Sequence, residues 1–375
     1  MRIVMICSSP GIGLVPYPVE LAIYFREHGH EVYAIAGAEK EYEIGLHARL
    51  SKANIPLHYV PCIDSSYGWL NPTRNMLRSL LSKLDPDVVH YWGPRNAFQG
   101  YLWWQRKQPI RIAMIGSMGH VKGISPGVRI AASIANRSLD RVLGLCEIEV
   151  DRLLKVGIDP KKVGIMHFPL ACSRNLEYAR DGYRLGKAEV LKKHRVPNGK
   201  KLLAMFAHFH PHKGHELLLS SFTKLAPDFP DWDLVLGGDG VTVERCRTMA
   251  NKLTNRVHFV GRLPHDEVMR LLSLCDAAVH PSFVETYGFS MLEPLLFGLP
   301  SVITHVGIAQ ELERASVAIV VEPKDELAFS QGLRRLLRND EDIRAMGARG
   351  REYVLKTFDT PVISEQLLSL YSSMM

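Results

Sequence analysis

Short apolar runs with strand character alternate with helical segments along most of the chain, and this alternation limits the possible folds more than any other feature. In the first unit, Arg2–Ser8 is typical of an apolar strand, Val19–His28 of a helix that ends at Gly29, and Glu31–Ala36 of a second strand. A fully apolar strand is buried on both faces, as in a parallel sheet covered by helices. The chain is therefore expected to be an α/β protein.

The same pattern predicts two series of strands, each interrupted by helices. The expected strands are 2–8, 31–36, 57–60, 87–90, 111–115, 142–145 and 163–167 in the first series, and 201–207, 233–236, 257–260, 277–280, 301–304 and 318–321 in the second. A chain of 375 residues is also too long for one ordinary core. We expect an N-terminal domain over 1–175, a polar connection over 176–199, a C-terminal domain over 200–355, and a helical tail over 356–375 that packs back on the N-terminal domain.

The net charge of +7 is carried entirely by the first half of the chain. Residues 1–175 hold 21 Lys and Arg against 14 Asp and Glu, whereas residues 176–375 hold 25 of each. A basic half suits an anionic partner, such as a nucleotide diphosphate, a phospholipid surface or a phosphate-linked acceptor, although a solvated basic face has the same composition. The basic residues form no clustered stripe, so nucleic-acid binding is not expected.

The cysteines and the apolar segments indicate a cytoplasmic protein, at most attached to the inner face of a membrane. The six cysteines are widely spaced and predict buried free thiols in a reducing compartment. The long uncharged stretch 294–310 is interrupted by glycine and proline and does not resemble a membrane span. The apolar run 1–8 is too short for a secretion signal.

Two carboxylates, Glu285 and Glu293, flank a loop that enters a predicted helix. Free N–H groups at the start of that helix suit a diphosphate. Glu293, about one turn into the helix, is placed to accept hydrogen bonds from a ribose diol, and Glu285 to hold sugar hydroxyls. A capped surface helix with two solvated acids would show the same spacing. Further candidates for donor contacts lie between the carboxylates: Thr286, Tyr287, Gly288 and Phe289.

The segment 285–293, ETYGFSMLE, is similar to the E-x7-E motif of the family-4 retaining glycosyltransferases. Several other segments resemble the same family in the same order along the chain. They are 20–22 (ELA), 29–32 (GHEV), 213–219 (KGHELLL), 237–240 (GGDG), 260–262 (VGR) and 276–282 (DAAVHPS). The resemblance extends over nearly the whole chain and is densest from 200 to 310.

The resemblance implies a GT-B fold, in which two Rossmann-like domains face each other across a cleft. It also implies a nucleoside-diphosphate sugar held by the C-terminal domain, a carbohydrate or lipid-linked acceptor held by the N-terminal domain, and transfer with retention. The resemblance implies no metal and no cofactor besides the nucleotide sugar. Cations and backbone N–H groups must then meet the charge of the leaving diphosphate.

Lys213 fits that role, because it lies between a predicted strand and a predicted helix. The family commonly carries an arginine five residues earlier, where this chain has His208. A histidine is a weaker, pH-dependent partner for phosphate. Three histidines in 208–212 also resemble a metal cluster, but no matched cysteine or second histidine pair lies nearby.

Two candidates in the first half rest on a looser resemblance. The Gly11–Gly13 segment resembles a glycine loop that contacts phosphate or acceptor, which makes Gly13 a candidate for donor binding; a simple strand-to-helix turn would look the same. His120 follows a predicted strand, in a region where related enzymes place a histidine near the transferred sugar, and is a candidate catalytic residue. A solvent-facing loop histidine is the alternative.

The expected function is retaining sugar transfer in glycan, polysaccharide or glycolipid biosynthesis. One rival is another GT-B enzyme, a nucleotide-sugar epimerase or a phosphorylase. A second is a non-catalytic protein that binds or scaffolds sugar nucleotides, which the histidine at position 208 and the loosely matched glycine loop at 11–13 favour. The presence of Glu285, Glu293 and Lys213 argues against this second rival.

Overall fold

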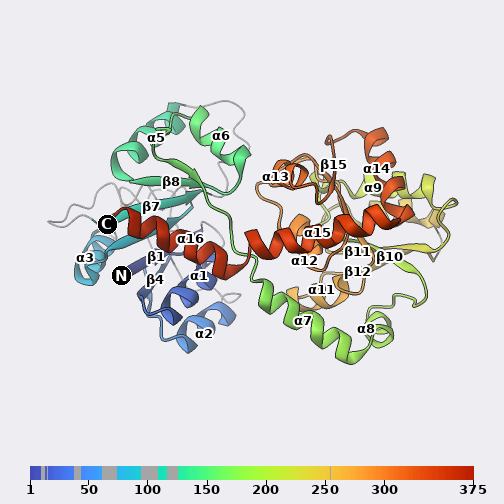
Figure 1. The fold of residues 1–375 in the computed structure, drawn as a ribbon, viewed down its shortest axis with the longest axis horizontal. Coiled ribbons are helices and arrows are strands. Elements are labelled where there is room, and N and C mark those ends of the chain that lie inside the picture. Colours follow the sequence, from blue (N-terminus) through green and yellow to red (C-terminus); the bar gives the residue numbers. More distant parts are fainter. Residues whose placement is uncertain are drawn as a thin grey trace. The chain divides into compact units, whose positions relative to one another are not determined.

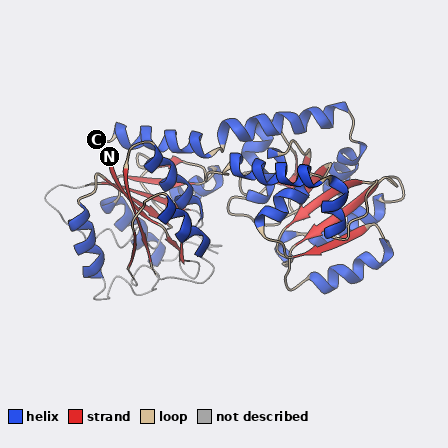
Figure 2. Ribbon diagram, turned by 90° about the horizontal axis from the view of Figure 1, so that it is seen from below, coloured by secondary structure: helices blue, strands red, loops and turns tan. Residues whose placement is uncertain are grey.

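The computed structural model describes residues 1–9, 13–14, 16–37, 44–60, 74–93, 109–115, 126–253 and 255–375. The chain forms two compact units. Unit 1 comprises Met1–Pro169 together with Thr360–Met375, and unit 2 comprises Leu170–Asp359. Each unit has a parallel sheet with helices on both of its faces (Figures 1 and 2).

Unit 1 is built on seven described strands in the order β5-β4-β1-β6-β7-β8-β9. They are β1 (Arg2–Ile6), β4 (Glu31–Ala36), β5 (Leu57–Tyr59), β6 (Val88–Trp92), β7 (Ile110–Ile115), β8 (Arg141–Gly144) and β9 (Val163–Ile165). All of β6 is buried, as its apolar sequence requires. After β1, the short strands β2 (Ser8–Ser9) and β3 (Gly13–Leu14) pair antiparallel, a ribbon that the sequence pattern does not predict.

The C-terminal helix α16 (Thr360–Ser373) belongs to unit 1 and packs against α1 (Pro16–Glu27). Tyr371 is buried on this helix, and its hydroxyl lies 2.5 Å from Nδ1 of the buried His90 on β6. Phe25 of α1 contacts the Tyr371 ring edge-on. The other described helices of unit 1 are α2 (Ile44–Lys52), α3 (Arg74–Leu84), α5 (Pro126–Ser138) and α6 (Glu147–Lys155).

Unit 2 has six strands in the order β12-β11-β10-β13-β14-β15. They are β10 (Lys201–Phe206), β11 (Trp232–Gly237), β12 (Val257–Gly261), β13 (Ala277–His280), β14 (Ser301–Thr304) and β15 (Ile319–Val321). Its helices are α7 (Cys172–Leu185), α8 (Lys187–Lys193), α9 (His215–Leu225), α10 (Val243–Ala250), α11 (His265–Leu272), α12 (Phe289–Leu296), α13 (Ala309–Arg314), α14 (Glu326–Arg338) and α15 (Glu341–Thr357), with short 3-10 turns η5 (Pro211–Lys213) and η6 (Asn251–Leu253).

Alternate residues of the central strands of unit 2 enter two different cores. On β10, Leu203 and Met205 join the cluster that includes Phe222 and Phe329, whereas Leu202 belongs to the cluster that includes Met269. Because successive side chains of a strand point to opposite faces, the sheet is covered on both sides. This double burial explains why the strands read as continuous apolar runs.

The polar connection predicted over 176–199 is instead largely helical and part of unit 2. Helix α7 packs against α11, and the Tyr183 hydroxyl donates to the carbonyl of Ser273 at 2.9 Å. On α8, Val190 and Leu191 are buried. A few apolar residues on one face thus dock these two helices, although the segment as a whole is polar.

The described cysteines are buried free thiols, as predicted: Cys7, Cys146, Cys172, Cys246 and Cys275. Burial raises the pKa of the Cys246 thiol to about 11, so it stays protonated at neutral pH. In the described part of the chain, no helix combines the length and the apolar character that crossing a bilayer requires.

Candidate active site

The strand order of unit 2 reverses between β10 and β13. From β10 the chain proceeds outward to β11 and β12, and it then returns to β13 on the other side of β10. In open parallel sheets, ligands bind beyond the carboxyl ends of the strands at such a reversal. Lys213 follows β10 and Glu285 follows β13, so both candidates lie at this position.

The loops after β10 and β13 contact each other through their backbones. The Phe283 N–H donates to the carbonyl of His212 at 2.6 Å. Gly214 has φ +76°, and a Cβ at this position would lie 2.0 Å from the carbonyl oxygen of Pro281. Only glycine allows this approach, which sets the lysine-bearing turn against the glutamate-bearing loop.

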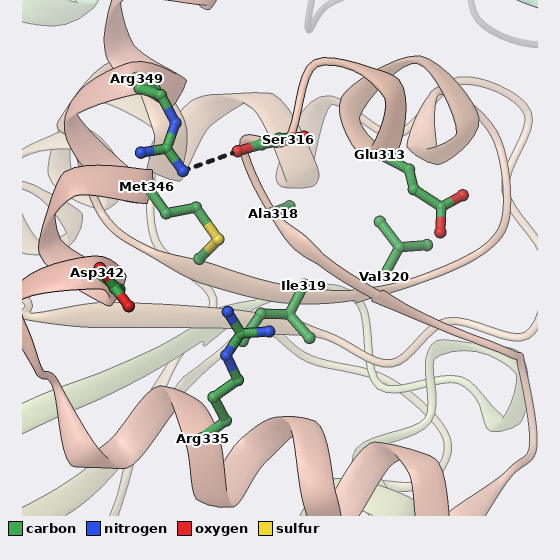
Figure 3. A pocket seen from close by; sticks show the side chains of 9 residues that line it. All are labelled: Glu313, Ser316, Ala318, Ile319, Val320, Arg335, Asp342, Met346 and Arg349. Carbon is green, nitrogen blue, oxygen red and sulfur yellow. Dashed lines mark hydrogen bonds between the residues drawn. The ribbon is translucent and has the colours of Figure 1, made fainter.

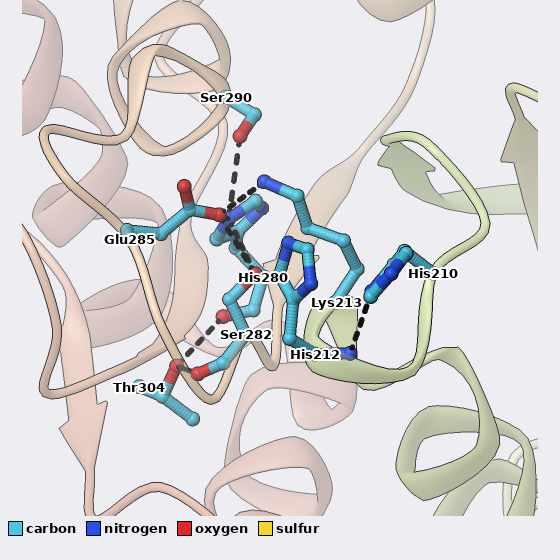
Figure 4. Close-up of polar contacts among 8 residues, drawn as sticks. All are labelled: His210, His212, Lys213, His280, Ser282, Glu285, Ser290 and Thr304. Atoms are coloured by element: carbon cyan, nitrogen blue, oxygen red, sulfur yellow. Dashed lines mark hydrogen bonds and ion pairs between the residues drawn. The ribbon is translucent and has the colours of Figure 1, made fainter. Parts of the chain in front are cut away.

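The Glu285 carboxylate is the centre of a polar cluster (Figure 4). Its Oε1 accepts from Nζ of Lys213 at 2.5 Å, from Nε2 of His280 at 2.8 Å and from the hydroxyl of Ser282 at 2.8 Å. Nε2 of His280 also lies 3.0 Å from the Ser282 hydroxyl and 3.3 Å from that of Ser290. The cluster therefore joins η5, β13 and α12 through side chains.

This cluster keeps Glu285 ionised. Burial alone would raise the pKa of the carboxyl, but the hydrogen bond and charge of His280 and the charge of Lys213 outweigh it and lower the pKa to about 2. Figure 4 shows the second carboxylate oxygen, Oε2, turned away from the three donors. Glu285 thus presents one oxygen that is not used by the cluster.

Glu293, on α12, has a different environment. Its side chain is 17% exposed, and its Oε1 lies 3.8 Å from Nδ1 of His265. Burial raises the pKa of Glu293 to about 8. The surroundings of the two glutamates therefore act in opposite directions, because the polar cluster favours the ionised form of Glu285 and burial favours the protonated form of Glu293.

Glu293 lines a hollow of about 490 Å³ at the carboxyl ends of β10, β11 and β12. Neither Glu285 nor Lys213 is among its lining residues, whereas His208 is. Such a hollow has the size of a small-molecule site. The lining also includes Gly238, Asp239, Arg262, Leu263 and Val268.

His208 is 57% exposed, and its Nδ1 lies 3.2 Å from Oδ1 of Asp239. The other oxygen of Asp239 lies 3.6 Å from Nη1 of Arg262. Arg262 is a permanently charged group at the same hollow, and the sequence interpretation did not single it out. Its place directly after the glycine that ends β12 was the available signal.

Among the described residues, the remaining candidates that the sequence predicts do not belong to the cluster around Glu285. Tyr287 is buried and contacts the Phe289 ring edge-on, with ring centres 5.0 Å apart, and Gly288 precedes α12 with φ +104°. Gly13 pairs with Ser9 in the β2–β3 ribbon of unit 1. His120 lies outside the described residues. The described residues contain no group of three or more His, Cys, Asp or Glu side chains placed to hold a metal.

A second hollow of unit 2, of about 420 Å³, lies at the sheet edge formed by β15 (Figure 3). Its walls carry Arg335 and Asp342, from α14 and from the first turn of α15. It is lined by the residues that begin β15, not by those that follow the strand. The candidate site is therefore assigned to the reversal between β10 and β13.

Two family models match the chain and together include most of it. The model described as Glycosyl transferases group 1 matches residues 186–353, and the model described as Glycosyltransferase Family 4 matches residues 13–171. Each match falls largely within one of the two units.

The chain is 25% identical to N-acetyl-alpha-D-glucosaminyl L-malate synthase of Bacillus anthracis, with 96% of each chain covered. It is 23% identical to D-inositol 3-phosphate glycosyltransferase of Corynebacterium glutamicum, over 88% of this chain and 80% of the relative. Among solved structures, HepE of Anabaena in complex with UDP matches with a TM-score of 0.81 at 16% identity, with both chains fully covered. This likeness shows that the fold is of the GT-B type.

Proposed function

Because the chain belongs to the family-4 glycosyltransferases, we propose that it moves a sugar from a nucleoside-diphosphate sugar to an acceptor hydroxyl with retention of anomeric configuration. The observation that carries this proposal is the contact of Lys213 with Glu285 at the strand reversal, at 2.5 Å. It sets a cation for a departing diphosphate beside a carboxylate that can bind sugar hydroxyls.

The donor is proposed to bind unit 2. Glu293 in the hollow of about 490 Å³ would bind the ribose hydroxyls, and Lys213 would bind the diphosphate at the positive end of the α12 dipole. Arg262 supplies further positive charge at the same hollow, and His208 supplies a ring nitrogen. The solved complexes of HepE with UDP and with UDP-glucose support a nucleotide sugar as ligand.

The chemical step is proposed to occur on one face of the sugar. The bond from the anomeric carbon to the phosphate oxygen breaks with its electron pair going to the phosphate, while the acceptor oxygen bonds to the same carbon. The acceptor proton passes to the departing phosphate oxygen. Glu285 is a poor nucleophile, because three donors hold its Oε1 and its pKa is lowered to about 2. Its proposed role is to position the donor sugar.

The acceptor is proposed to be an anionic, phosphate-linked carbohydrate or lipid. The charge excess of residues 1–175 supports this, and the names of the two relatives contain L-malate and D-inositol 3-phosphate, which are also anionic. Contact with an anionic membrane is part of the proposal. On α5, Ile130 is 62% exposed between the exposed Arg129 and Arg137.

Thermal shift against UDP, GDP, ADP and their sugars tests the donor, because a ligand that binds only the folded state raises the melting temperature. We expect one nucleotide to raise it in the wild type, and Lys213→Ala to lose most of the shift. Arg335→Ala, in the distant hollow of Figure 3, is the matched loss of a cation and should keep the shift.

The NMR couplings of the first product formed with that donor then report the anomeric configuration. An inverted product would refute retention, and a sugar phosphate or an epimerised donor would identify one of the rival enzymes. If no nucleotide shifts the wild type, the proposed donor site is wrong.

A further inference from the structure

His280 is the last residue of β13 and is 2% exposed. Its Nε2 faces three oxygens, those of Glu285, Ser282 and Ser290, within 3.3 Å. An ionised carboxylate only accepts hydrogen bonds, so Nε2 must carry a proton that it donates to Glu285. The buried imidazole is therefore a hydrogen-bond donor that points at Glu285.

Lys213 and His280 donate to the same oxygen, Oε1 of Glu285. If the proposed function is right, the donor diphosphate brings at least two negative charges to the turn that carries Lys213. A lysine ammonium is a compact point charge on a flexible stem and can turn toward them. Glu285 would then lose the closest of its three hydrogen-bond donors at the moment when the sugar arrives.

We propose that His280 is a positioning residue that holds Glu285 in place and ionised when the donor diphosphate draws Lys213 away. With Oε1 fixed by His280 and Ser282, Oε2 remains the oxygen that faces the sugar hydroxyls. The inference rests on the proposed function and adds to it a residue that the sequence motif does not mark.

The electrostatics support this role. The titratable groups whose charges act on Glu285 are Lys213 from η5 and His280 from β13, and burial opposes both by raising the pKa of the carboxyl. Once Lys213 has moved, the hydrogen bonds from His280 and Ser282 are what still favours the carboxylate form. Without His280, Glu285 is expected to take up a proton nearer to neutral pH.

The loop itself does not depend on the imidazole. The Thr304 hydroxyl, on β14, donates to the carbonyl of His280 at 3.3 Å and also to that of Ser282. The backbone that carries Glu285 is therefore fixed from the neighbouring strand. Removal of the ring donor should change the carboxylate more than the fold.

The test compares His280→Leu, which has no donor, with His280→Gln, whose side-chain amide can donate to the same oxygen. Calorimetry on the full chain measures binding of UDP and UDP-glucose, of GDP and GDP-mannose, and of ADP and ADP-glucose. The pair that binds the wild type is then used for donor hydrolysis as a function of pH.

We expect His280→Leu to bind the free diphosphate within about twofold of the wild type, and to lose about 10- to 100-fold in hydrolysis of the sugar nucleotide. The acid limb of its pH profile should move upward by about one to two units. His280→Gln should recover most of both losses. Ser220→Ala is the matched control, because it removes a hydroxyl that donates to Glu326 at 3.0 Å outside this cluster, and it should resemble the wild type.

Three results would overturn the inference: an unchanged pH profile in His280→Leu, a His280→Gln as impaired as His280→Leu, or an equal loss of affinity for diphosphate and sugar nucleotide. A wild type that binds none of the six nucleotides would instead refute the proposed function, and the inference with it. The two failures are distinguished by the wild-type measurement alone.

Discussion

Replacement of Glu293 by glutamine is expected to stabilise the folded chain at alkaline pH while it weakens nucleotide binding. The carboxyl is largely buried, and its one ion-pair partner among the described residues is His265, at 3.8 Å. Burial lowers the pKa of His265, so this partner is neutral near pH 7. Glutamine has nearly the same shape as glutamic acid and carries no charge at any pH.

The magnitude follows from proton linkage. The folded state keeps the proton of Glu293 up to about pH 8, whereas the unfolded chain releases it near 4.5. Between these values the folded state binds more protons, so its stability falls as the pH rises. A span of about 3.5 units at about 1.36 kcal/mol each corresponds to a loss on the order of 5 kcal/mol by pH 8, with the full contribution present below pH 4.5. The Glu293→Gln variant lacks this loss.

Guanidinium unfolding at about pH 5, 6.5 and 8 measures the effect as a difference between variant and wild type, in which titrations common to both cancel. The difference should be small at pH 5 and grow in favour of Glu293→Gln at pH 8. Glu244→Gln, at an 85% exposed position of α10, is the matched control and should show no such trend. A difference for Glu293→Gln that stays constant with pH, or changes in the opposite direction, would refute the raised pKa of the Glu293 carboxyl.

Three shorter expectations concern other residues of the chain. His208→Arg restores a permanent cation and should tighten diphosphate binding by on the order of tenfold in calorimetry; no gain would mean that Arg262 already fulfils this role. Tyr371→Phe leaves the buried His90 without its 2.5 Å partner and should cost about 1–2 kcal/mol in the free energy of unfolding. Ile130→Glu should reduce cosedimentation with anionic vesicles at low salt; a wild type that stays in the supernatant would exclude that contact.

The fold was largely predictable because both sheets are buried on both faces. Each strand expected from an apolar run is present, with ends within about one or two residues in most cases. Helix α7 was missed because few of its apolar residues, such as Ala179, are buried, whereas α8 had a helical period only around 189–194. In a mostly polar segment, so few apolar positions give no clear period.

The residues of the candidate site were predictable where the resemblance supplied a motif. The contacts between them were not, because these depend on how the loops pack. Lys213 and Glu285 were both candidates, but a contact of 2.5 Å between them depends on how two loops lie against each other. His280 was not a candidate, because a histidine at the end of an apolar strand is ordinarily a core residue. Its importance arises from the turn that brings Glu285 back onto it five residues later.

Burial alone does not mark a functional carboxylate in this protein. Glu149 in unit 1 is fully buried, yet it forms an ion pair with Arg152 one helical turn away, which is the usual way to retain a charge in the interior. Glu293 is the contrasting case. Its one ion-pair partner in the part of the chain that the structure describes is a neutral histidine, and its ionised form is therefore expected to destabilise the fold. Glutamine at this position would avoid that cost, so folding gives no reason for a glutamate here. A ligand that binds the carboxylate would give a reason for the glutamate. Such a ligand would bind in the hollow that Glu293 lines.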